Sequence, residues 1–110
     1  RKDQISFLLD SFIKKNYNQP INTQTLADQF GFTPAYLSKI FREFKNMSPT
    51  EYIVMLRIEK AKELLLQTPP ILIKDISLAV GYEEPQYFSR VFKKSTGLSP
   101  RQFISQNTKQ

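Results

Sequence analysis

The sequence repeats itself with a period of 50–51 residues, and this repeat restricts the possible folds more than any other feature. An offset of 50 or 51 pairs identical residues in the two halves: Pro20/Pro70, Gly31/Gly81, Tyr36/Tyr87, Ser38/Ser89, Phe41/Phe92, Ser48/Ser99 and Pro49/Pro100. Two copies are too few for a solenoid, which needs about three or more repeats. The simpler interpretation is two small subdomains of similar structure.

Apolar residues recur with the period of an α-helix. The first helical face is formed by residues at positions i, i+3, i+4, i+7 and i+8, which are Ile5, Leu8, Leu9, Phe12 and Ile13. The three glycines, Gly31, Gly81 and Gly97, all fall where a helix must end, and no stretch predicts a strand. We expect an all-α fold of about seven helices. Asn22 caps the second helix, which ends before Gly31, and Thr33 caps the third, which begins at Pro34 and ends near Asn46. The others are expected at about 3–16, 49–67, 73–80, 85–96 and 100–106.

Each copy of the repeat has the pattern of a helix-turn-helix, namely a short helix, a glycine-centred turn and a longer basic helix. The capping box Ser48-Pro49-Thr50-Glu51 opens the longest helix, which is apolar on more than one side and should pack against more than one body. The expected organisation is a first helix-turn-helix subdomain at 1–48, a linker helix at 49–68 and a second helix-turn-helix subdomain at 69–110.

The composition excludes several kinds of chemistry. The 110 residues include neither His nor Cys. Ser-His and Cys-His nucleophile pairs are therefore impossible, and a thiolate zinc site is excluded. Glu59 and Glu63 lie four residues apart, but Lys60 and Lys62 beside them favour a charged surface over catalysis. We expect no enzymatic activity, no metal and no cofactor.

Positive charge is concentrated in two places along the chain. The 16 Lys and Arg outnumber the 10 Asp and Glu, which gives a net charge of +6. Residues 31–46 carry +2 and residues 85–110 carry +5, whereas residues 47–84, with four basic and six acidic side chains, carry −2. Because the basic runs and the strongest apolar stripes lie in different helices, the pattern favours nucleic acid over a membrane surface as the acidic partner.

These motifs together resemble the C-terminal DNA-binding domain of AraC/XylS-type transcription regulators. The similarity is strongest in Ile76-Ser-Leu-Ala-Val-Gly-Tyr82, Tyr87-Phe-Ser-Arg-Val-Phe-Lys-Lys94 and Gly97-Leu-Ser-Pro-Arg-Gln-Phe103. Arg57-Ile-Glu-Lys-Ala-Lys-Glu-Leu-Leu65 resembles the linker helix of the family, and the likeness covers about residues 5–106. The second half also resembles versions that serve as output domains of response regulators.

The resemblance implies sequence-specific binding of double-stranded DNA by a cytoplasmic bacterial transcription regulator. Two recognition helices would enter successive major-groove segments, and a helix of about 18 residues, about 27 Å long, fits units held one DNA turn (roughly 34–36 Å) apart. RNA polymerase is a further expected partner, and an upstream sensor or receiver domain is expected outside this sequence. No membrane partner is expected. The operator, the regulated genes and the choice between activation and repression stay open.

By the same resemblance, residues near the start of each recognition helix are candidates for contacts with base edges. These are Thr33, Pro34, Ala35, Ser38 and Lys39 in the first unit, and Pro85, Gln86, Ser89 and Arg90 in the second. Ala35 can contact only a thymine methyl group, whereas Gln86 and Arg90 match adenine and guanine. Candidates for phosphate contacts are Asn22, Arg42, Lys45, Lys93, Lys94, Ser99 and Arg101.

Two alternatives remain open at this level. Aromatic residues can stack on bases. Helical spacing favours packing in the core for Phe12, Phe30, Phe41, Phe44, Tyr52, Phe88, Phe92 and Phe103. Tyr36 and Tyr87 are expected to pack with a partly exposed hydroxyl, at a position that can also border the DNA. The whole chain can also be an all-helical protein-interaction module whose basic face meets an acidic protein. A gel shift with random duplex DNA would separate that module from a DNA-binding domain.

Overall fold

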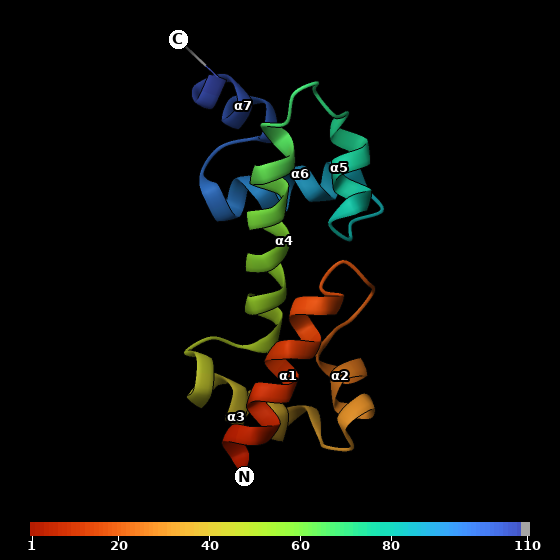
Figure 1. Ribbon diagram of the computed structural model, residues 1–110, viewed down its shortest axis with the longest axis vertical. Helices are drawn as coiled ribbons and strands as arrows, with labels where there is room; N and C mark the ends of the chain where they lie inside the picture. The colour runs from red at the N-terminus through yellow and green to blue at the C-terminus, as the bar shows by residue number, and fades with distance from the viewer. Residues whose placement is uncertain (109–110) are drawn as a thin grey trace. The chain divides into compact units, whose positions relative to one another are not determined.

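The computed structural model describes residues 1–108, which form seven α-helices and no strand (Figure 1). The helices are α1 (Lys2–Asn16), α2 (Thr23–Phe30), α3 (Pro34–Lys45), α4 (Pro49–Leu65), α5 (Ile73–Ala79), α6 (Pro85–Thr96) and α7 (Pro100–Thr108). The chain divides into two compact units, Arg1–Leu56 and Arg57–Gln110, so the division falls inside α4. The predicted all-α class is confirmed. Lys109, which belongs to the basic C-terminal run, lies outside the described residues.

Local sequence signals determine where these helices begin and end. Asn22 and Thr25 form a capping box at the start of α2, and a Ser-to-Glu or Ser-to-Gln box recurs at Ser48 and Ser99. Gly31 closes α2 in the left-handed region at φ 75°. These caps satisfy the backbone groups that a helix leaves unpaired at its ends, so the boundaries follow from the sequence.

Helix α4 is shorter than its apolar pattern predicts. The expected range is 49–67, but the helix ends at Leu65. Its continuation tightens into three-residue turns, because the amides of Leu66 and Gln67 donate to the carbonyls of Glu63 and Leu64 at 3.4 and 3.3 Å. Two prolines follow at 69 and 70, where no helical amide is available. The α-helical hydrogen bonding thus ends at Leu65, a few residues before the first proline.

The core of the first unit is built from four helices. It holds fully buried residues of α1, α2 and α3 together with the start of α4: Leu9, Ile13, Leu26, Ala27, Leu37, Ile40, Phe41, Tyr52 and Ile53. Helix α3 packs against both α1 and α2. The second unit has its own set, with Ile58, Ala61, Leu65, Ile76, Val80, Phe88 and Phe92 buried. Helices α3 and α6, the longer second helices of the two repeats, are thus each held by an apolar face inside their own unit.

Ring packing repeats between the units at the positions that the sequence repeat pairs. The rings of Phe41 and Tyr52 lie 5.5 Å apart, and those of Phe92 and Phe103, their counterparts, also lie 5.5 Å apart. Most aromatic residues pack as predicted. Phe44 is the exception, since 38% of it is exposed although its ring lies 6.4 Å from that of Phe41. The repeated sequence therefore encodes a repeated interior.

Within residues 1–108, no helix has the length and apolar character needed to cross a membrane.

Candidate nucleic-acid interface

The two recognition helices, α3 and α6, present matched positions in the same way. Ala35 and its counterpart Gln86 are exposed, and so are Lys39 and its counterpart Arg90. Ser38 and Ser89, like Pro34 and Pro85, are partly buried, and Thr33 is exposed in front of α3. The candidate base-contact residues thus form one outward face on each helix, beside the buried face that anchors it. Proline at the first helical position has a backbone φ suited to a helix start, so it favours the start of both helices at this point.

The turns before the recognition helices are built alike. The amide of Phe32 donates to the carbonyl of Ala27 at 3.0 Å, and the amide of Tyr82 donates to the carbonyl of Ser77 at 2.8 Å. In the second unit the Ser77 hydroxyl adds a buried bond of 2.6 Å to the Tyr82 carbonyl. These bonds hold the angle between the short helix and the recognition helix in each unit.

Arg57 supports the second turn from α4. Its guanidinium lies 4.9 Å from the centre of the Tyr82 ring. It also lies close to Gly81, where an added Cβ would be 3.0 Å from Nε of Arg57. Burial raises the pKa of the Tyr82 hydroxyl above its usual value, although the neighbouring arginine opposes this. Arg57 itself is almost completely buried. A buried cation at this place stabilises the turn and is not available to a ligand.

The second unit contains a hollow where α5, α6 and α7 begin. It is lined by Ile73, Lys74, Pro85, Gln86, Ser89, Arg90, Ser99, Pro100 and Arg101. Six of the sequence-predicted contact residues of this unit therefore lie together around one concave surface. The other three lining residues, Ile73, Lys74 and Pro100, are not among the predicted contact residues. The repeat aligns Lys74 with Gln24 of the first unit, so a comparison of the two copies could have shown that the second unit has an additional cation here.

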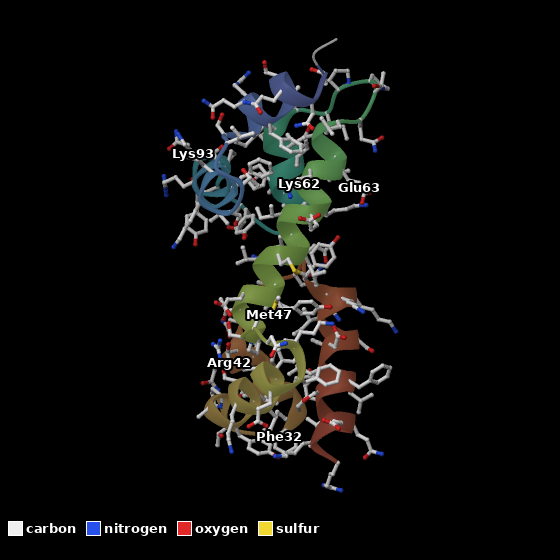
Figure 2. The ribbon with its side chains drawn as sticks, turned by 90° about the vertical axis from the view of Figure 1, so that its left-hand side faces the viewer. Phe32, Arg42, Met47, Lys62, Glu63 and Lys93 are labelled. Carbon is white, nitrogen blue, oxygen red and sulfur yellow. The ribbon has the colours of Figure 1, made fainter. Side chains whose placement is uncertain are left out.

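The cations of the two recognition helices differ in their partners. Arg42 lies 3.7 Å from Glu51, and Lys45 lies 3.2 Å from Asp10 and 5.0 Å from the centre of the Tyr52 ring. Among residues 1–108, no acidic side chain pairs with Arg90, Lys93 or Lys94 of α6, nor with Arg101 of α7 or Lys39 of α3. Figure 2 shows Lys93 projecting outward from α6. The second unit therefore offers more uncompensated positive charge.

Asp10 is a buried carboxylate that the sequence pattern does not predict. Burial alone would raise its pKa, but hydrogen bonds from the Tyr52 hydroxyl and the Lys45 ammonium, with Lys14 nearby, hold the pKa below its usual value. Burial, together with the hydrogen bond to Asp10, raises the pKa of the Tyr52 hydroxyl. The Lys45 side chain is only 30% exposed. Its ammonium thus ties the end of α3 to α1, a role beside the predicted phosphate contact.

Three further predicted residues have partners inside the protein. The amides of Asn22 and Ser99 donate to the side chains of Thr25 and Gln102, both at about 2.8–2.9 Å, so these two amides are already used in their capping boxes. Arg90 lies 5.7 Å from the centre of the Tyr87 ring, which is 51% exposed. This contact orients the arginine while leaving its charge unneutralised. Within residues 1–108 no group of acidic residues could hold a metal ion.

Comparison with known proteins defines the class of this chain. Residues 26–106 match the model of a helix-turn-helix domain family. The fold matches the C-terminal domain of AraT, a response regulator from Geobacillus stearothermophilus, with a TM-score of 0.88 and 33% identity over 93% of this chain and 84% of that chain. It also matches the C-terminal domain of the two-component response regulator yesN from Fusobacterium nucleatum, with a TM-score of 0.82 and 30% identity over 88% of this chain and 94% of that chain.

A longer relative has a similar sequence. The chain is 34% identical over 96 residues to the bifunctional transcriptional activator/DNA repair enzyme AdaA of Bacillus subtilis, over 87% of this chain and 45% of that protein. It therefore spans less than half the length of this relative. The chain belongs to the AraC/XylS-type helix-turn-helix family, and its fold is that of a DNA-binding domain of transcription regulators.

Proposed function

We propose that the chain binds double-stranded DNA sequence-specifically as the DNA-binding domain of a bacterial transcription regulator, with α3 and α6 in successive segments of the major groove. The observation that supports this most strongly is the matched exposure of Ala35/Gln86 and Lys39/Arg90. Each pair lies beside a buried anchoring face, which is how a recognition helix presents side chains to base edges. DNA binding also follows from the family.

The second unit reads bases more strongly than the first in this proposal. Arg90 and Gln86 can each form two hydrogen bonds with a base edge, to guanine and adenine respectively, worth roughly 1–3 kcal/mol of discrimination each. Ala35 offers only a methyl group, and Lys39 is a single point charge. Because the repeat is imperfect at these positions, we expect an asymmetric binding site.

Outside the base-contact face, cations should contact phosphates and set affinity without selecting sequence. Lys93, Lys94 and Arg101 are free of acidic partners in the described chain, so they contribute most. Arg42 would have to exchange Glu51, an exposed and weak partner, for a phosphate. Lys45 contributes least to DNA binding, because Asp10 and the Tyr52 ring already hold its ammonium.

The remaining organisation is also proposed. Residues 49–68 act as a linker between helix-turn-helix subdomains at 1–48 and 69–110, and the chain itself has no catalytic role. The similarity to C-terminal domains of response regulators supports a receiver or other sensor domain upstream. RNA polymerase is the proposed protein partner, and the cytoplasm is the proposed location.

Substitution of Arg90 tests the base-contact assignment. Sites bound by the protein are first selected from random duplexes, and Arg90→Ala is then compared with the unchanged protein on the selected site and on a single-base variant. We expect discrimination at one base pair to fall by roughly 1–3 kcal/mol while circular dichroism stays the same. Unchanged specificity would reject the role of Arg90.

Footprinting on the selected site tests the use of both units. Two protected segments about one helical turn apart would support engagement of both α3 and α6. Protection of one segment would mean that the first unit only supports the second. If no duplex is shifted even at low salt, the protein-interaction module becomes the better explanation of the basic face.

A further inference from the structure

The hollow at the starts of α5, α6 and α7 combines cations from three separate helices. Lys74, Arg90 and Arg101 line it, and its lining includes no acidic side chain. None of the three forms an ion pair within the described part of the chain. Lys74 and Arg101 are exposed, so their charges face solvent rather than the core. Such a concave and uncompensated cluster is a suitable site for an anion.

The first unit provides an internal comparison for this hollow. The repeat places Gln24 and Thr50 where the second unit has Lys74 and Arg101. Gln24 donates to Asp28 at 2.9 Å, and the Thr50 hydroxyl lies 3.3 Å from that of Thr23. The equivalent corner of the first unit therefore lacks these two cations, and the side chains that replace them form hydrogen bonds, one of them with the carboxylate of Asp28. The fold of the unit does not require cations at these two positions.

The chemistry of the lining indicates which anion fits. One wall of the hollow carries Gln86 and Arg90, the strongest candidates for base contacts. A phosphate of the DNA backbone is the anion that lies beside a base edge in the same complex, and point charges such as lysine bind it without requiring a defined orientation. The Ser99 hydroxyl, which also lines the hollow, accepts from the amide of Gln102 at 3.1 Å and keeps its own proton to donate.

We propose that this hollow seats one phosphate of the bound duplex between Lys74 and Arg101, and that the first unit has no equivalent seat. This inference rests on the proposed function. The seat fixes the register of α6 in the groove through one shared backbone contact, while α3 is positioned without such an anchor. Lys74 is thereby assigned a positioning role that base-contact residues do not have.

The test measures duplex affinity by fluorescence anisotropy across a series of salt concentrations. We expect Lys74→Ala and Arg101→Ala each to weaken binding about 3–10-fold on every sequence. Because both cations share one phosphate, the double variant should reduce the slope of log affinity against log salt by about one, not two. The matched controls are Gln24→Ala and Thr50→Ala, for which we expect less than a twofold change. Circular dichroism melting shows whether each variant is folded.

A second arm locates the phosphate itself. Duplexes carrying one neutral methylphosphonate are compared at successive backbone positions. At one position the unchanged protein should lose affinity, whereas the Lys74→Ala, Arg101→Ala double variant should lose nothing more. If no position behaves in this way, or if the two variants bind and respond to salt as the unchanged protein does, the seat does not exist.

Titration with inorganic phosphate distinguishes a backbone phosphate from a free one. Saturable binding of inorganic phosphate that Lys74→Ala abolishes, with duplex affinity unchanged, would mean that the hollow holds a small anion and not DNA. The proposed function fails separately, through absence of duplex binding by the unchanged protein. Selective binding that none of the four substitutions alters would overturn only the phosphate seat.

Discussion

At the scale of single residues, Asp10 is a buried carboxylate of the first unit that pairs with two lysines. Its side chain is only 9% exposed and meets the ammonium groups of Lys45 at 3.2 Å and Lys14 at 3.8 Å. Lys14 belongs to α1 and Lys45 to the last turn of α3, so the carboxylate joins the two helices. A buried charge of this kind is costly when its partners are removed or when it loses its own charge.

Replacing this carboxylate should destabilise the protein at neutral pH. We expect Asp10→Asn to lower the free energy of unfolding by about 1–3 kcal/mol, because the negative charge that pairs with Lys45 and Lys14 is lost. The folded-state pKa of Asp10 lies below the ordinary value of 3.8. The stabilisation is therefore complete above that ordinary value and disappears as the pH falls through the lower folded-state pKa.

Denaturant melts of both proteins between pH 7 and pH 2 measure this effect. The difference in stability should be largest above about pH 5 and should shrink in the acidic range. Glu63→Gln, on the exposed surface of α4 (Figure 2), is the control and should change stability by less than about 0.5 kcal/mol. A difference that does not depend on pH would contradict the electrostatic explanation.

Gly81 is a second residue whose surroundings restrict which amino acid can occupy the position. Its φ is 109°, and a Cβ there would lie 3.0 Å from Nε of the buried Arg57. Gly97 has φ 84°, and a Cβ there would have no neighbouring atom within 4 Å. Both conformations are unfavourable for other residues, but only at Gly81 does a neighbouring side chain also have to move.

We therefore expect Gly81→Ala to cost about 2–3 kcal/mol of stability and Gly97→Ala about 1 kcal/mol. The first substitution adds displacement of Arg57 to the backbone strain that both share. Thermal melts followed by circular dichroism give the comparison. Equal losses in the two variants would show that Arg57 moves aside without penalty.

At the scale of elements, α3 and α6 pack into their units in the same way but differ in how many of their cations form ion pairs. The buried faces pack matched rings at the same 5.5 Å spacing, and the exposed faces place residues at matched positions. The acids near α3 neutralise Arg42 and Lys45, while the cations of α6 stay unpaired in the described chain. The two helices are thus equivalent in position and unequal in electrostatic attraction to DNA.

Lys94 of α6 tests this inequality. We expect Lys94→Ala to reduce duplex affinity about two- to fivefold, equally on selected and random sequences, and to lower the salt slope by about one. Lys62→Ala is a suitable control, because its ammonium pairs with Glu59 at 3.0 Å on α4. Anisotropy titrations on both duplexes give the answer. A loss confined to the selected sequence would instead place Lys94 at a base edge.

The sequence predicted the elements well because their signals are local. Each cap or stop, such as Thr33 with Pro34 or Gly97, lies within a few residues of the boundary that it sets. The bond between Asp10 and Lys45 was missed because it joins residues 35 apart and depends on how α1 meets α3. The exposed Phe44 was missed for a related reason, since helical spacing does not show where a neighbouring helix ends.

At the scale of the whole molecule, the net charge of +6 understates how uneven the attraction to DNA should be. In the first unit, acids pair with several of the cations, including Lys2, Lys14 and Lys45. The cations of α6 and α7 have no such partners within residues 1–108. The second unit should therefore dominate the salt-sensitive part of binding.

We expect log affinity for a random duplex to fall with log salt with a slope of about −3 to −5. Neutralising Lys93, Lys94 and Arg101 together should reduce that slope by about two to three. Neutralising Lys2, Lys14 and Lys45 should change the slope by less than one. Titrations between low and physiological salt measure both, and equal effects of the two triple variants would contradict the unequal distribution.

The matched interiors of the two units have a consequence for how such a protein can change its target. A duplicated frame keeps the turn, the capping box at Ser48 and Ser99 and the ring contacts in each unit, while positions such as Ala35 and Gln86 have diverged without disturbing them. Residues that hold the shape and residues that face outward are therefore largely different sets. Each half can acquire a new preference independently, so a long recognition site can evolve one half at a time.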